Sequence, residues 1–298
     1  MTRNQRARFL ALSMLAAIGA ALLAVIIATF WMTPNDSLAY WIAGHRLAAG
    51  EPVYVAPDAA FEPYAFHYPA PVAQLLAPIA VVVPALAFCV IYRSLMLFAL
   101  WDLAGRRMLN MLALIAFLPM AVALRIENVE IFMALGIVIG LRRWPWLFSV
   151  GALIKVSPGL GIVYLAMRRR WRDVAIATAV GVAIAAVSFL VSPELWRAST
   201  ESITGRVGMV GNSLIPVPYV YRAIAGLILA VVGGLIGRRR GELLLVVGIT
   251  IANPGLSLQG FAVLAAAIPI WRAGPEGLLG RFETAGPAPA AVPQLQGT

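Results

Sequence analysis

The sequence predicts an all-α fold, a polytopic bundle of membrane helices, and three observations support this. Of the 298 residues, 61% are hydrophobic and 12% are charged, with a mean hydropathy of +0.87, more apolar surface than a water-soluble fold buries. Long runs of Ala, Leu, Val and Ile lack the alternation of a membrane β-barrel, and helices satisfy their own backbone hydrogen bonds in lipid. Arginines gather in short clusters between these runs, as the positive-inside rule expects.

The net charge of +10 therefore reflects membrane orientation. No soluble segment of the sequence carries a basic face with interleaved aromatic residues, so we expect no nucleic-acid partner. The clusters predict a multi-pass protein with a cytoplasmic N-terminus. Abundant Ala and Arg with a single lysine indicate a GC-rich bacterial genome, and hence a bacterial inner (plasma) membrane. The clusters lie at Arg3/Arg6/Arg8, Arg106/Arg107, Arg142/Arg143, Arg168–Arg172 and Arg238–Arg240.

Residues 9–32 form the first predicted helix. The run is longer than a signal-peptide core of about 7–15 residues and ends in a poor cleavage site, so we expect a retained helix entered from the cytoplasm. Residues 33–68 then form an external loop. Within it Asp36 to Ala49 predicts an amphipathic surface helix, in which Asp36 caps the start and Gly50 follows the end. Its apolar positions are Leu38, Trp41, Ile42 and Leu47.

The next segments alternate between the two faces. Residues 68–84 give only about 15 apolar positions between prolines, which is short for a crossing and favours a re-entrant or interfacial helix. Residues 85–104 return to the cytoplasmic arginines, and 108–124 lead outward again to a short external segment, 125–130. The following helix, 131–141, ends at the next arginine cluster.

Residues 144–167 lie between two arginine clusters that should share a side. The simplest prediction is a hairpin of two half-helices broken at 155–159, and the alternative is one span with a misplaced cluster. The chain then predicts an outward helix at 174–191, a third external loop at 192–213 and an inward helix at 219–237. Residues 242–271 predict two short helices interrupted at 253–255 and 259–260, which completes one transmembrane domain, 1–272, with about 8–10 membrane helices including half-helices. Residues 273–298 have the composition of a disordered tail.

This topology collects scattered polar residues at the outer face. Because side chains that converge in space from separate segments are the first sign of a site, they form the candidate site. The sequence offers no histidine–cysteine cluster for a metal and predicts no cofactor, and the lone Cys89 excludes an intramolecular disulfide. The converging residues are Asp36, His67, Glu127, Asn128, Asn212 and Asn253.

Three short motifs follow the first predicted helix: Asp36–Trp41, Leu47–Tyr54 and Phe66–Pro71. They resemble motifs of glycosyltransferase family 87, a family of the C-superfamily (GT-C) that contains polyprenol-phosphate-mannose-dependent mannosyltransferases. Further matching segments are Glu127-Asn128, the Lys155–Pro158 segment and the Gly211–Leu214 segment. The chain departs from the family at 253–260, which lacks the usual tryptophan and histidines, and before Asn128, which lacks a Gly-Gln pair.

The resemblance implies a GT-C-like bundle that transfers a mannose-like sugar from a polyprenyl-phosphate donor to a lipid or glycan acceptor at the extracytoplasmic face, among membrane lipids. It implies Asp36 as the general base, whereas the local pattern alone favours a helix cap. The substrate-binding candidates are His67, Tyr68, Glu127, Asn128, Lys155, Arg206, Asn212 and Ser213.

Each binding candidate has a structural alternative. Lys155, the single lysine, lies in an apolar stretch and either binds the carrier phosphate or pairs with a buried carboxylate or carbonyl. His67 either contacts substrate or stabilises the interface. Glu127 either orients the acceptor hydroxyl or is solvated or paired with Arg125. Arg206 is a second phosphate candidate.

Two other functions compete with a glycosyltransferase. Broken helices near Lys155 and Asn253 are also typical of transporters that hold a substrate at the bilayer midplane. The departure at 253–260 fits an inactive membrane scaffold of a glycan-assembly system.

Overall fold

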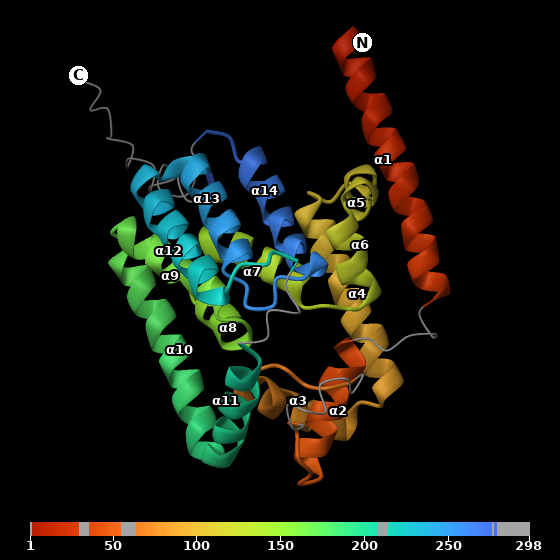
Figure 1. The fold of residues 1–298 in the computed structure, drawn as a ribbon. Helices are drawn as coiled ribbons and strands as arrows, with labels where there is room; N and C mark the ends of the chain where they lie inside the picture. The colour runs from red at the N-terminus through yellow and green to blue at the C-terminus, as the bar shows by residue number, and fades with distance from the viewer. Residues whose placement is uncertain (1, 30–35, 55–63, 208–213, 276, 279–298) are drawn as a thin grey trace, which may run out of the picture.

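The structure is a computed structural model, and it describes residues 2–29, 36–54, 64–207, 214–275 and 277–278. These residues form helices, turns and loops with no strand, which confirms the all-α prediction. The helices pack into one bundle, with α1 along its side (Figure 1). Their bounds are α1 Arg3–Ala28, α2 Asp36–Ala48, α3 Ala70–Val82, α4 Ala85–Leu103, α5 Met108–Ile115, α6 Leu118–Arg125, α7 Glu130–Arg142, α8 Leu147–Ile154, η3 Ser157–Gly159, α9 Leu160–Met167, α10 Trp171–Val191, α11 Pro193–Val207, α12 Tyr219–Ile236, α13 Arg238–Ile251, η5 Leu258–Ala266 and α14 Ala267–Arg272.

Within the described residues, four helices are long and apolar enough to cross a membrane: α1, α4, α10 and α12. A fifth crossing exists if the bent pair α5 and α6 is one span. Shorter apolar helices complete the bundle, among them α3 with 13 residues. The predicted 8–10 membrane helices therefore correspond to a few full spans and several shorter helices.

Residues 108–124, predicted to lead outward, form two helices rather than one, because α5 and α6 meet at an angle of 89°. Pro119 lies in the first turn of α6. A proline ring has no N–H and clashes with the carbonyl four residues earlier, here that of Ile115, so a continuous helix is broken at this point. Pro119 is therefore the local signal in the sequence for this break.

The arginine clusters gather at one end of the bundle. Asp102, Gly105, Arg142 and Arg272 line one pocket there, which joins the ends of α4, α7 and α14. The guanidinium carbon of Arg239 lies 4.1 Å from the ring centre of Trp271, which adds the start of α13. Helices α2, α3 and α11 lie at the other end (Figure 1). We refer to these two ends as the arginine end and the α2–α3–α11 end.

Helices α8 and α9 form the predicted hairpin rather than one span. The ring of Phe148 lies against Gly161, and a Cβ atom on Gly151 would stand 2.8 Å from the Cβ of Pro158. Positions 151 and 158 face one another nearest the break, and 148 and 161 face one another farther from it, which is the order of two antiparallel arms. The guanidinium of Arg168 lies against Gly237, at the arginine end. Both ends of the hairpin thus face the arginine end, and Lys155 lies at its tip.

Helix α2 begins at the predicted Asp36 but buries a different face. Its buried residues include Ser37, Tyr40 and Gly44, while the predicted apolar positions are half-buried. A Cβ atom on Gly44 would stand 2.6 Å from the carbonyl oxygen of Leu76, so the glycine allows α3 to approach closely. Helix α2 therefore packs against α3 instead of lying alone on a membrane surface.

Two further segments differ from the prediction of irregular chain. The expected loop 192–213 contains α11, which the Trp196 side chain fixes to α10 by donating to the Ser188 hydroxyl at 2.9 Å. Beyond residue 272 the chain still packs, because the Leu278 amide donates to the Glu242 carboxylate at 2.7 Å. The rest of the predicted tail, 279–298, lies outside the described residues.

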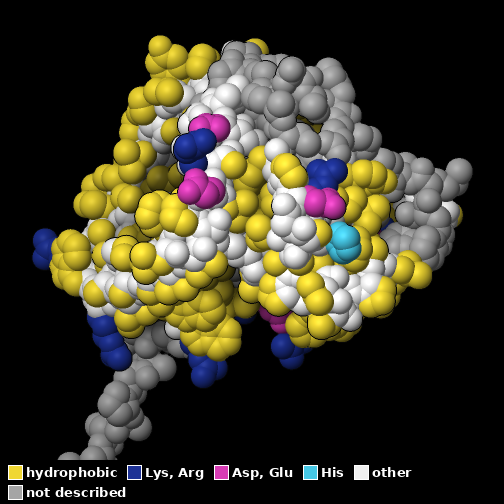
Figure 2. Space-filling view, turned by 90° about the horizontal axis from the view of Figure 1, so that it is seen from below, with side chains coloured by type: hydrophobic (Ala, Val, Ile, Leu, Met, Phe, Trp, Pro, Cys, Tyr) yellow, Lys and Arg dark blue, Asp and Glu magenta, His cyan; other side chains and the backbone are white. Residues whose placement is uncertain are grey.

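The α2–α3–α11 end is largely apolar, with charged side chains in small groups (Figure 2). On α11, Arg197 and Glu201 form an exposed pair with Nε and Oε1 3.5 Å apart. An exposed ion pair of this kind contributes little to stability, about 0–1 kcal/mol.

Candidate functional site

Asp36 meets the turn between α6 and α7. The backbone amide of Asp36 donates to the carbonyl oxygen of Ile126 at 2.8 Å. The side-chain amide of Asn128 donates to Oδ2 of Asp36 at 2.7 Å. Residues 92 positions apart in the sequence thus hold the first turn of α2 against this turn, and the Asp36 carboxylate is fixed by a hydrogen bond.

Glu127, in the same turn, is fully buried. Its carboxylate accepts a hydrogen bond from the Ser37 hydroxyl and pairs with the guanidinium of Arg93 on α4. Burial raises the pKa of Glu127, and the Ser37 hydrogen bond and the Arg93 charge oppose that rise. Its φ of +58° lies in the left-handed region, which costs a non-glycine residue about 1 kcal/mol or more and recurs at functional sites. A solvated Glu127, one of the sequence alternatives, is excluded.

A second buried carboxylate, Glu130, ties three distant segments together. It pairs with the Lys155 ammonium at the hairpin tip. Its Oε1 also accepts from the side-chain amide of Asn253 at 2.7 Å, and its backbone amide donates to Oδ1 of Asn128 at 3.2 Å. Lys155 therefore has the buried carboxylate partner that was one of its two predicted alternatives.

The electrostatic environment of Asp36 suits proton transfer. Burial raises the pKa of Asp36 from its ordinary 3.8 to about 6, while the positive charge of Lys155 and the Asn128 hydrogen bond lower it and the charge of Glu127 raises it. A carboxylate with a pKa near 6 is ionised at neutral pH and is still a better proton acceptor than an ordinary aspartate.

Tyrosines form a wall beside Asp36. The hydroxyl oxygens of Tyr40 and Tyr68 lie 2.8 Å apart, and the Tyr54 hydroxyl donates to the carbonyl oxygen of Tyr68 at 2.9 Å. Burial raises the pKa of both Tyr40 and Tyr68 well above the usual range, and the negative charge of Asp36 adds to it. Both hydroxyls therefore stay protonated. His67, next to Tyr68, lies at an exposed position.

The structure brings together five of the nine predicted site residues: Asp36, Tyr68, Glu127, Asn128 and Lys155. It places His67 on the segment that carries Tyr68. Arg206 lies in the last turn of α11, and its side chain is outside the described part of the chain. Asn212 and Ser213 lie outside the described residues as well.

Four members of this cluster are absent from the predicted catalytic and substrate-binding residues: Ser37, Arg93, Glu130 and Asn253. Arg93 carries a usable signal in the sequence, because an arginine isolated within an apolar span is costly and implies a partner. Asn253 is one of the converging polar residues of the sequence analysis, which assigned it no binding role. Ser37 carries no signal, since a serine at a helix start is ordinary.

No group of three or more His, Cys, Asp or Glu side chains is placed to hold a metal ion in the described ranges of the chain. The carboxylates of the cluster are instead opposed by protein cations, Arg93 and Lys155.

Residues 66–286 match the family model described as glycosyltransferase family 87, which covers most of the chain. Asp36 precedes the matched range, whereas Tyr68, Glu127, Asn128 and Lys155 lie inside it. No curated protein and no solved structure matches the chain.

Proposed function

The chain belongs to glycosyltransferase family 87, and we propose that this membrane glycosyltransferase moves a mannose-like hexose from a polyprenyl-phosphate carrier to a lipid or glycan acceptor. The observation that carries the proposal is the hydrogen-bonded carboxylate of Asp36, whose pKa of about 6 suits a general base. The short motifs shared with polyprenol-phosphate-mannose-dependent enzymes support the donor class.

In this reaction an acceptor hydroxyl attacks the anomeric carbon of the donor sugar. The new bond joins the acceptor oxygen to that carbon, the bond from the carbon to the phosphate oxygen breaks, and Asp36 takes the hydroxyl proton. Polyprenyl phosphate leaves with the bonding electrons as a stable anion. One base therefore suffices, and no acid is needed to protonate the leaving group.

The neighbours of Asp36 position it. Asn128 fixes one carboxylate oxygen, and the Glu127–Ser37 contact holds the first turn of α2 to the same turn of chain. A base held by packing and hydrogen bonds loses less entropy when it meets the acceptor hydroxyl. We assign Glu127 and Asn128 to this positioning role, and Tyr68 and His67 to contacts with the sugar or its phosphate.

Lys155 is the proposed phosphate-binding cation. Its ammonium has three donors, and its charge influences the pKa of Asp36, so an anion at Lys155 would lie close to the proposed base. Glu130 and Asn253 hold the hairpin tip in place. Arg206, Asn212 and Ser213 remain proposed substrate contacts from the loop after α11.

The proposed location is a bacterial inner membrane, with the N-terminus and the arginine end in the cytoplasm. The acceptor then enters from the α2–α3–α11 end, since clusters of lysine or arginine next to membrane helices stay on the cytoplasmic side during insertion.

The test is reconstitution of the purified full chain in vesicles with radiolabelled polyprenyl-phosphate mannose and membrane lipid acceptors. We expect transfer by the wild type and a loss of about 100-fold or more for Asp36→Asn, since general bases contribute about 10²–10⁴-fold. The matched control is Asp173→Asn on α10, where Asp173 pairs with Arg170 at 2.5 Å near the arginine end. Absence of transfer by the wild type would favour a scaffold, and equal transfer by Asp36→Asn would remove Asp36 from the mechanism.

A further inference from the structure

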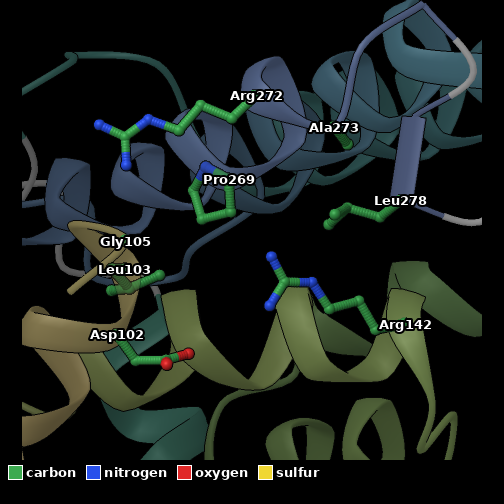
Figure 3. Close-up of a pocket in the computed structure, with 8 residues that line it drawn as sticks. All are labelled: Asp102, Leu103, Gly105, Arg142, Pro269, Arg272, Ala273 and Leu278. Atoms are coloured by element: carbon green, nitrogen blue, oxygen red, sulfur yellow. The ribbon is translucent and has the colours of Figure 1, made fainter.

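A pocket of about 320 Å³ lies at the arginine end. It is formed where the C-terminal ends of α4 and α7 meet α14 and the chain that follows it (Figure 3). The side chains of Arg142, Asp102 and Leu278 point toward the shared space, while Arg272 extends over Gly105 (Figure 3). The pocket therefore combines a cation, a carboxylate and an apolar wall.

Arg142 is the lining cation that forms no ion pair with any carboxylate of the described residues. Its side chain is half-buried, and within the described ranges it makes no ion pair or side-chain hydrogen bond. Arg272 is already engaged, because it donates to the carbonyl oxygen of Ala104 at 2.8 Å. The Asp102 carboxylate pairs with Nε of Arg106 at 3.2 Å, so its charge is offset. A half-buried guanidinium is stabilised by an anion that fills the space in front of it.

The surroundings place this pocket at the depth of lipid headgroups. Trp144 and Trp271 flank it in the sequence and are 43% and 61% exposed. Tryptophans with exposed rings concentrate at the membrane–water interface, where the phosphates of phospholipids lie. Arg143 and Arg239 lie over these two rings, which adds positive charge around the opening.

We propose that this pocket binds the phosphate of an anionic phospholipid from the leaflet at the arginine end. A guanidinium forms paired hydrogen bonds with phosphate oxygens, and basic pockets between membrane helices at this level accept anionic headgroups. Leu278 and Pro269 then contact the first carbons of the lipid. This site is distinct from the one around Asp36, because Glu130 and Arg142 lie at opposite ends of α7, roughly 18 Å apart along a helix of 13 residues.

The test measures equilibrium binding of radiolabelled short-chain phosphatidylglycerol to the purified full chain in an uncharged detergent. Arg142→Gln is compared with Arg143→Gln, a matched control on the adjacent exposed arginine, which does not line the pocket. We expect Arg142→Gln to raise Kd about tenfold and Arg143→Gln to raise it less than about twofold, in line with the loss of one charge-assisted contact. Asp36→Asn is expected to bind like the wild type, which separates this result from the proposed function.

Competition identifies the source of the phosphate. Unlabelled phosphatidylglycerol is expected to compete, whereas short-chain phosphatidylcholine and inorganic phosphate compete at least about tenfold more weakly. Competition by inorganic phosphate at equal concentration would assign the pocket to a soluble phosphate compound and overturn the lipid assignment. Equal losses in Arg142→Gln and Arg143→Gln would reduce the effect to general attraction by the basic end. Arg142→Lys keeps the charge, so partial recovery of binding with unchanged Tm would show that the loss in Arg142→Gln is not a folding defect.

Discussion

Asp36 combines three features that rarely occur together in an ordinary helix cap. It is largely withdrawn from water, it accepts a hydrogen bond from Asn128, and it lies near one lysine and one further carboxylate. A cap needs none of these, since it acts on its own helix. These features support the proposed role of Asp36 as a general base, and the titration of Asp36 provides the most direct test.

The pH dependence of transfer is the first prediction. Protonated Asp36 cannot accept the acceptor proton, so kcat/KM should fall as the pH drops through about 6. Glu127→Gln removes a negative charge that raises the Asp36 pKa, and should move the midpoint to lower pH. Lys155→Met removes a positive charge that lowers this pKa, and should move the midpoint to higher pH. Midpoints that move together in both variants would contradict the assignment.

The stability of Asp36→Asn is the second prediction. The pKa of Asp36 is higher in the folded state, about 6 against 3.8, so the native state binds the proton more strongly and stability falls as the pH rises between these values. At pH 7 the buried charge therefore costs folding free energy, of the order of 1–3 kcal/mol. Asp36→Asn should raise Tm at pH 7 while lowering activity, and its advantage should shrink at pH 4. A lower Tm at pH 7 would show that the charge stabilises the fold.

At the scale of elements, helices α12 and α13 pack closely through glycines. A Cβ atom on Gly226 would stand 2.6 Å from the carbonyl oxygen of Gly248 and 2.7 Å from the Cβ of Ala252. Small residues at such crossings let helix backbones approach and replace the hydrophobic driving force that lipid removes. Arg222 of α12 also donates to the carbonyl oxygen of Asn253 at 2.6 Å, and this hydrogen bond holds the backbone of a residue that contacts Glu130.

Gly226→Ala is the third prediction. The added methyl group meets backbone on the facing helix, so the variant should lose about 1–3 kcal/mol and show a lower Tm in detergent. Gly136→Ala on α7 is the control, because nothing lies within 4 Å of its Cβ position. That variant should keep its stability or gain about 0.4–1 kcal/mol, because alanine restricts the unfolded chain. Equal Tm values for the two variants would contradict the close packing.

At the scale of the whole molecule, the arginine clusters and the proposed base occupy different ends of the bundle. The topology predicted from the sequence requires this separation, and under the proposed function the reaction takes place on the side away from the positive clusters.

Sided labelling is the fourth prediction. In a Cys89→Ala background, single cysteines replace Glu51 or Glu201 near α2 and α11, or Arg143 or Arg240 at the arginine end; all four positions are exposed. A membrane-impermeant maleimide added to intact cells should label the first two, and label the last two only after the membrane is opened. Labelling of all four from one side would overturn the proposed orientation.

The membrane setting, the helices and many helix ends can be predicted from properties of short stretches of sequence. Hydropathy over about 20 residues selects the bilayer as solvent and the helix as the element, and each arginine cluster marks a helix end. The break at Lys155 and the early Asp36 helix were also readable, because proline, glycine and a capping residue act locally. The family resemblance named the same family that the chain matches.

What the sequence by itself did not determine is which polar side chains meet. The bend at Pro119, the pairing of Arg93 with Glu127 and the position of Asn253 beside Glu130 depend on how each helix is rotated and how closely it packs. Rotation is set by the sum of many weak contacts between distant segments, and inside an apolar bundle a buried charge stabilises only the rotation that gives it a partner. Local sequence therefore determines that the chain lies in a bilayer and forms helices, whereas tertiary packing determines which side chains form the candidate site.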